Sequence, residues 1–214
     1  MIAQTHTMSA SREHWQSVYR EKSAAQTSWF RAHLDASLRL IDGLRLDLGA
    51  ALIDVGAGRS TLVDDLLARG FNDLTLLDIA EPALAESRTR LGDDAARVRW
   101  VVADVLDAPL PDSHFDVWHD RAVFHFLTEP AQRARYLRQL LRALRPGGHA
   151  VVATFAEDGP QRCSALPVCR YDIASLAAQF APHFERCNGT RDEHRTPWGA
   201  VQPFTYVLLR RKAA

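Results

Sequence analysis

Three groups of residues in this chain have the types and spacing to do chemistry. The first is the segment Ile53 to Ser60, which contains Gly56 and Gly58. Glycines let a ligand approach the main chain closely, because they adopt backbone conformations that a side chain penalises. The second is Asp78, a carboxylate able to accept hydrogen bonds from both hydroxyls of a ribose. The third is the titratable run 119–121. Together they predict a nucleoside site beside groups that can hold charge or move a proton.

These residues need a strand-turn-helix scaffold to position them. The run 51–55 is short and apolar, as in a buried parallel strand, and the run 60–68 has helical spacing of its apolar residues. The two glycines therefore lie at a strand-to-helix turn, next to the partly positive N-terminus of a helix. Asp78 ends the next apolar run. This order is typical of a nucleotide-binding crevice.

Strand and helix patterns alternate along the chain, which predicts a doubly wound α/β fold with a mostly parallel sheet. For the helix before the fifth strand, Thr128 is the expected cap and Pro130 suits the first turn. The expected strands are 51–55, 73–77, 98–102, 115–119 and 149–155, and the expected helices are 60–68, 82–91, 131–144 and 172–181.

Two common nucleotide motifs do not fit the turn. Thr61 occupies the place where the dinucleotide fingerprint requires Gly or Ala, which disfavours NAD and FAD. The phosphate-binding P-loop requires a Lys after its second glycine, and the only lysines of the chain are Lys22 and Lys212. Nucleoside triphosphate hydrolysis is disfavoured as well.

The turn instead resembles motif I of the class I, seven-strand, S-adenosylmethionine-dependent methyltransferases, in which an acid and two spaced glycines end the first strand. The usual third glycine is Ser60 here. The resemblance covers residues 50–155, and its further landmarks follow in order: Asp78, Ala103-Asp104-Val105, Phe115-Asp116-Val117-Trp118 and Leu144-Arg145-Pro146-Gly147-Gly148.

This resemblance implies a seven-stranded sheet with helices on both faces, in which 184–188 and 204–211 form a terminal antiparallel pair. It also implies S-adenosyl-L-methionine as cofactor and S-adenosyl-L-homocysteine as product. Asp78 matches the ribose-binding acid of the family, and Asp104 and Val105 match the residues that hold adenine. The expected cofactor-binding residues are Asp54, Gly56, Ala57, Gly58, Ser60, Asp78, Ile79, Asp104, Val105, Tyr19 and Trp29.

The run His119-Asp120-Arg121 follows the fourth predicted strand, where the reactive methyl group is expected to point. His119 has the intrinsic pKa of a general base, Asp120 could hold the ammonium of the cofactor, and Arg121 could hold an anionic group. If the strand continues through these residues, neighbours point to opposite sides of the sheet and all three cannot share one direction. A purely structural role for His119 and Arg121 stays open. His125 is expected in the core or in a groove.

The two flanks of the core are expected to form the acceptor side. Residues 1–45, with Trp15, Tyr19, Trp29 and Phe30, predict a helical lid that excludes water, although packing on the sheet is an alternative. Residues 156–214 supply a long connection, a helix and the terminal strands. With the cofactor core at 50–155, they make one expected domain, 1–214.

Composition narrows the class of partner. The chain has 26 basic and 26 acidic residues, so no net charge attracts nucleic acid or an anionic membrane. The polar start and the lack of a spanning apolar run predict a cytoplasmic protein. Cys163, Cys169 and Cys187 show no paired spacing, which indicates neither disulfides nor a metal site. The alternative hypothesis is that the three thiols together bind a metalloid.

These features predict a methyltransferase acting on a small molecule. A protein lysine acceptor is the second interpretation, and a non-catalytic module that binds the cofactor is a third, because a fold locates a ligand without proving turnover. The acceptor atom and the oligomeric state cannot be read from the sequence.

Overall fold

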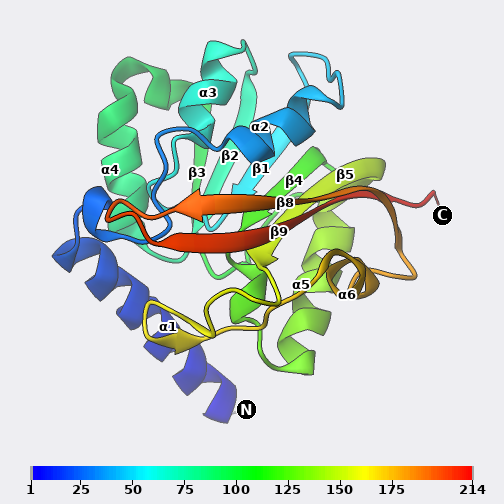
Figure 1. The fold of residues 1–214 in the computed structure, drawn as a ribbon. Helices are drawn as coiled ribbons and strands as arrows, with labels where there is room; N and C mark the ends of the chain where they lie inside the picture. The colour runs from blue at the N-terminus through cyan, green and yellow to red at the C-terminus, as the bar shows by residue number, and fades with distance from the viewer. Residues whose placement is uncertain (1, 214) are drawn as a thin grey trace.

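A seven-stranded sheet forms the centre of the computed structural model (Figure 1), which describes residues 2–213, with side chains from residue 11 on. Met1 and Ala214, the ends of the expected domain, lie outside the described residues. The strand order is β3-β2-β1-β4-β5-β9-β8. Neighbours from β3 to β5 pair in parallel, whereas β9 is antiparallel to β5 and β8 is antiparallel to β9. The bounds are β1 Ala51–Val55, β2 Asp73–Asp78, β3 Val98–Val102, β4 Phe115–Arg121, β5 Leu144–Phe155, β8 Phe184–Arg195 and β9 Val201–Arg211.

Helices cover both faces of the sheet, as the resemblance implied. Alternate residues of the strands pack against α2 and α3 on one face and against α5 and α6 on the other, so each face of the sheet carries a large apolar core. The longer helices are α1 Ile2–Glu21, α2 Asp35–Asp42, α3 Leu62–Ala68, α4 Glu81–Leu91, α5 Pro130–Ala143 and α6 Ile173–Ala178. Short 3₁₀ turns lie at Ala24–Gln26, Gly92–Arg97 and Phe124–Phe126.

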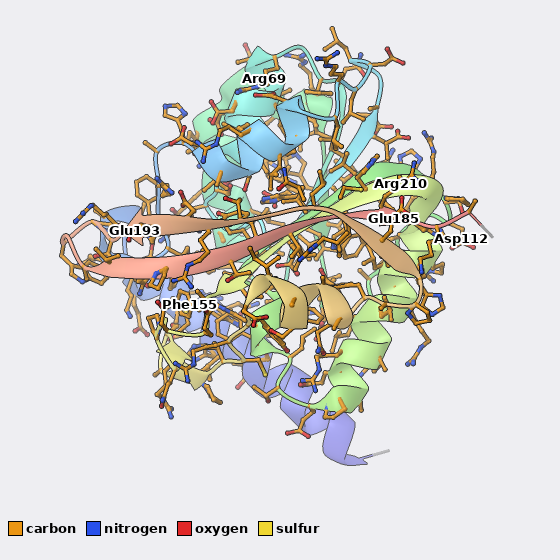
Figure 2. All side chains as sticks on the ribbon, turned by 45° about the vertical axis from the view of Figure 1, so that its right-hand side comes forward. Arg69, Asp112, Phe155, Glu185, Glu193 and Arg210 are labelled. Carbon is orange, nitrogen blue, oxygen red and sulfur yellow. The ribbon has the colours of Figure 1, made fainter. Side chains whose placement is uncertain are left out.

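The terminal hairpin is longer than predicted. β8 continues to Arg195 rather than ending near residue 188, although its exposed residues are mostly polar. Within the predicted part, Glu185 and Arg210 face each other and form an ion pair (Figure 2). Beyond residue 188 the pairing with β9 continues without a break from Gly189, opposite Val207, to Arg195, opposite Val201. Apolar periodicity therefore underestimates this strand, because cross-strand pairing and not burial extends it.

The prediction for the start of α5 was wrong in one residue. The helix is capped by Glu129 and not by Thr128, because Glu129 and Gln132 form a reciprocal capping box. Pro130 occupies the first turn, as predicted. The long connection after β5 also contains a small two-stranded sheet that was not predicted, β6 Arg162–Cys163 and β7 Leu166–Pro167.

The C-terminal end of α1 is held against the glycine turn by a single buried side chain. The guanidinium of Arg59 donates hydrogen bonds to the backbone oxygens of Tyr19 and Lys22 and to the carboxylate of Glu86 on α4. Arg59 also lies over the ring of Tyr19, 5.1 Å from its centroid. These contacts bring the aromatic residues of α1 to the carboxyl ends of the strands.

Candidate functional site

The glycine turn after β1 has the backbone conformation that only glycine adopts without strain. Gly56 and Gly58 have φ angles of +63° and +52°. A Cβ atom at Gly56 would lie 2.0 Å from Cγ2 of Val123, and one at Gly58 would lie 2.4 Å from the hydroxyl of Tyr19. Backbone angle and space therefore both require glycine at these two positions.

Asp78 connects the end of β2 to this turn. One carboxylate oxygen accepts a hydrogen bond from the backbone N–H of Gly58 at 2.8 Å, and the other accepts from that of Ala80 at 2.7 Å. Burial raises the pKa of Asp78 to about 6, although these hydrogen bonds favour the ionised form. The carboxylate lines a cavity and keeps free lone pairs for a ligand hydroxyl.

A cavity of about 410 Å³ lies at the carboxyl ends of the strands, within the range of about 300–1,000 Å³ usual for small-molecule sites. It brings together residues from the glycine turn, from the ends of β2 and β3, and from the N-terminal segment. Of the expected cofactor-binding residues, the cavity is lined by Gly56, Asp78, Ile79, Asp104, Val105, Tyr19 and Trp29.

Other expected residues lie beside this cavity and not in its wall. Asp54, Ala57 and Ser60 line a smaller cavity of about 50 Å³, which shares Gly56 with the larger one. Gly58 lines neither cavity, because the hydroxyl of Tyr19 packs against it. Its part in the site is to donate its N–H to Asp78.

His119 lies on the α2 face of the sheet, directly across from Asp54 in the register of β4 and β1. Its Nδ1 is 2.7 Å from a carboxylate oxygen of Asp54 and its Nε2 is 2.8 Å from the hydroxyl of Ser37 on α2. The ring is buried and lines the smaller cavity, with Asp54, but not the large one. Since both ring nitrogens have partners, the geometry favours the structural interpretation of His119 over the general base.

Asp120 points to the opposite face of the sheet. It accepts hydrogen bonds from the backbone N–H groups of Val123 and Phe124 and, at 2.6 Å, from the hydroxyl of Tyr136 on α5. Burial raises its pKa to about 6. Asp120 lines none of the cavities, so the structure does not bring it to the cofactor ammonium that the sequence suggested. It fixes the loop that follows β4.

Arg121 is the only one of the three that lines the large cavity. β4 extends through this residue, so the predicted alternation of directions is confirmed. The next residue, Ala122, has a φ of +74°, a conformation uncommon for a residue with a side chain. The chain therefore turns sharply at the site itself.

An aromatic cluster from α1 and the following loop covers the cavity. Trp15 packs edge-on against Trp29 and Phe126, with ring centroids 5.9 and 5.1 Å apart. Tyr19 packs against Trp29 at 6.2 Å. Burial and the charge of Asp78 raise the pKa of Tyr19 well above its usual value, so its hydroxyl stays protonated. These rings give the cavity an apolar cover.

The far side of the cavity is lined by residues that the sequence did not individually assign to the cofactor or acceptor site. Phe155 ends β5, Cys163 lies in β6, and Phe204 lies in β9. Figure 2 shows Phe155 beside the connection that carries β6 and β7. These residues are apolar and far apart in the sequence, so their patterns indicate only strands, and the pairing of β5 with β9 brings two of them together.

The structure gives no support to a metalloid site. Cys163 is buried, Cys169 is partly buried and Cys187 is exposed, in three separate segments. Burial raises the pKa of Cys163 to about 12. Among the described residues, no group of three His, Cys, Asp or Glu side chains is placed to hold a metal ion, and no helix has the length and apolar composition needed to cross a membrane.

Comparison with known proteins gives one family for the core. Residues 53–152 match the family model described as a methyltransferase domain. The ubiquinone/menaquinone biosynthesis C-methyltransferase UbiE of Roseobacter denitrificans is 31% identical over 121 residues, which cover 55% of this chain and 47% of that protein. The chain thus spans about half the length of this curated relative.

Two solved structures share the fold over nearly the whole chain. One comes from work on the conversion of a disulfide bond into a thioacetal group during echinomycin biosynthesis; its TM-score is 0.76 at 21% identity, covering 94% of this chain and 92% of that one. The other is the Burkholderia thailandensis 1,6-didemethyltoxoflavin-N1-methyltransferase with bound 1,6-didemethyltoxoflavin and S-adenosylhomocysteine. Its TM-score is 0.72 at 24% identity, covering 97% and 90% of the two chains.

The strand order, the glycine turn joined to Asp78 and the matched domain agree with one another. The core of the chain matches a methyltransferase domain, and the chain has the fold of the class I, Rossmann-like S-adenosylmethionine-dependent methyltransferases.

Proposed function

We propose that this chain transfers a methyl group from S-adenosylmethionine to a small molecule. The observation that supports the proposal is that a single cavity is lined both by the residues expected to bind the nucleoside and by a group of apolar residues. Gly56, Asp78 and Asp104 line one part, at the ends of the parallel strands, and Phe155 and Phe204 line the other. A donor and an acceptor bound in one cavity are held in a fixed relative orientation, which is the main requirement of methyl transfer.

The residues present fit the cofactor of this family. Asp78 would accept hydrogen bonds from the ribose hydroxyls, and Asp104 and Val105 would contact adenine. Gly56 leaves room for the cofactor to pass close to the backbone. Bound S-adenosylmethionine would supply an activated methyl group on its sulfonium. Tyr19 and Trp29 would cover the site, with Asp54, Ala57 and Ser60 near the methionine end.

For methyl transfer, the protein needs chiefly to align the donor with the acceptor and to enclose both. The aromatic cluster of α1 excludes water from the cavity. His119 and Asp120 keep β4 and its loop in place through Asp54, Ser37 and Tyr136. In this proposal neither of them removes a proton, and Arg121 is the group of the run that contacts the acceptor.

The small-molecule acceptor is supported by the apolar far wall of the cavity, and the Burkholderia structure with the same fold holds a small molecule. A protein lysine acceptor and a non-catalytic module that binds the cofactor are the alternatives. Incubation with S-adenosylmethionine labelled in the methyl group and fractionated cell extract tests all three. We expect the label in low-mass material. Label in protein would favour the lysine acceptor, and tight binding without transfer would favour the non-catalytic module.

A further inference from the structure

The guanidinium of Arg121 has unused hydrogen-bonding capacity at the wall of the cavity. Its Nε donates to the hydroxyl of Tyr206 at 3.1 Å and its Nη1 donates to the backbone oxygen of Trp29 at 3.1 Å. Its Nη2 is buried and has no hydrogen-bond partner among the described residues. Since a guanidinium has five N–H donors, three of them remain without a protein acceptor.

The positive charge of Arg121 also lacks a negative partner among the described residues, where it takes part in no ion pair. Asp192, an acid of the nearby hairpin, is bound 2.5 Å from Arg31 instead. The titratable groups that interact with Arg121 are uncharged near neutral pH: burial lowers the pKa of His125 to about 3 and that of His194 to about 4, and Cys163 is a protonated thiol. A partly buried cation without an anion is costly, and a bound anion would offset that cost.

The contacts of the guanidinium place it on the β9 side of β4. It lies over the ring of Phe204, 4.4 Å from the centroid, and donates a hydrogen bond to Tyr206. Both of these contacts are with residues of β9. In the sheet, β9 lies beyond β5 from β4, whereas the glycine turn follows β1 on the other side of β4. The guanidinium therefore lies near Phe155, Cys163 and Phe204 in the large cavity, and Arg121 also lines the smaller cavity beside the glycine turn.

We propose that Arg121 binds a carboxylate of the methyl acceptor, so that the substrate class is small acids with an apolar or aromatic body. The inference rests on the proposed function. Phe155 and Phe204 would contact the apolar body, while the planar fork of Arg121 would hold the carboxylate and set the distance from the acceptor atom to the methyl group. Tyr206 and Trp29 act as positioning residues, because they fix the guanidinium through its Nε and Nη1.

The test measures binding and needs no turnover. The protein is saturated with S-adenosylhomocysteine and titrated calorimetrically with benzoate and phenylacetate, and with their neutral amides benzamide and phenylacetamide. We expect at least one of the acids to bind about tenfold more tightly than its amide, the scale of a charge-assisted hydrogen bond. Arg121→Met should abolish this preference, and Arg121→Lys should keep part of it. Arg191→Met is the matched control, because Arg191 is an exposed residue of β8 paired with Glu157 and Asp158.

The results that overturn the proposal are distinct from a failure of the proposed function. If neither acid binds the wild-type complex more tightly than its amide, Arg121 is not a carboxylate site. If folded Arg121→Met weakens S-adenosylhomocysteine about tenfold, the guanidinium serves the carboxylate of the cofactor instead. A missing label in the transfer experiment would count against methyl transfer, whereas a clear preference for the acids would still establish the subsite.

Discussion

At the scale of single residues, the three neighbours His119, Asp120 and Arg121 in β4 have different roles, because consecutive side chains of a strand point to opposite faces of the sheet. His119 bonds Asp54 and Ser37 on the α2 face, Asp120 bonds Tyr136 on the α5 face, and of the three only Arg121 lines the large cavity. In a buried polar pair of this kind, removal of one member leaves the bonded atom of the other desolvated without a hydrogen bond. The role of His119 is therefore tested through stability.

We predict that His119→Ala lowers the free energy of unfolding by about 1–3 kcal/mol, because Asp54 and Ser37 lose their partner in a buried place. Affinity for S-adenosylhomocysteine should change little. Urea denaturation and calorimetry measure the two quantities. His33→Ala is the control, since His33 forms the same kind of pair with Asp65 at an exposed position and should cost less than about 1 kcal/mol. Equal costs for the two variants, or loss of methyl transfer in a folded variant that binds cofactor, would count against this role.

At the scale of elements, the turn between β1 and α3 is the most constrained segment of the site. It must leave space for Val123 and Tyr19 on the protein side and for a ligand on the other. The same turn is tied to β2 by the bond from Gly58 to Asp78. A side chain in the turn would thus disturb the cavity and the contact between two strands together.

For the turn, the expected outcome of Gly56→Ala is a loss of more than about 2 kcal/mol of stability, together with loss of cofactor binding, because strain at positive φ adds to the contact with Val123. Gly199→Ala is the matched control: Gly199 also has a positive φ, +89°, but a Cβ there meets no atom within 4 Å. It should cost about 1–2 kcal/mol and leave binding unchanged. Equal losses of stability and of cofactor binding in the two variants would contradict this role of Gly56.

The sequence predicts most elements here, because the buried strands are apolar runs and the glycine turn has a fixed spacing to Asp78. It does not predict the cap of α5 at Glu129, since Thr128 and Glu129 are both possible caps and the reciprocal bond to Gln132 decides between them. It also does not assign His119 or Asp120, whose partners Ser37 and Tyr136 come from other segments. Phe204 and Phe155 enter the cavity only through sheet pairing.

At the scale of the whole molecule, burial of titratable groups couples stability to pH. His125 and His194 are held neutral in the fold, with pKa values lowered to about 3 and about 4 from 6.5. The unfolded chain therefore binds more protons than the folded one below about pH 6.5, so these two residues contribute stability that is lost as the pH falls. Asp78 and Asp120, with pKa values raised to about 6, act in the opposite direction between about pH 6 and 4.

A difference measurement separates these opposing contributions. Urea denaturation of the wild type and of His125→Asn between about pH 7.5 and 4.5 should show the stability advantage of the wild type becoming smaller below about pH 6.5. The same substitution at an exposed histidine, His33→Asn, is the control. A difference curve for His125→Asn that is flat, or that rises toward acid, would show that His125 is charged in the fold.

The central claim is that the crevice formed by the Gly56 turn and Asp78 binds the nucleoside of the methyl donor, and the affinity for S-adenosylhomocysteine tests it most directly. In calorimetry at pH 7.5, Asp78→Asn should weaken binding by about 1.5–3 kcal/mol, the scale of hydrogen bonds to a charged group. Asp112→Asn should not, because Asp112 (labelled in Figure 2) is exposed and does not line the cavity. Wild-type affinity should also decline as the pH falls through about 6, where the Asp78 carboxylate takes up a proton. Unchanged affinity in folded Asp78→Asn would contradict the account.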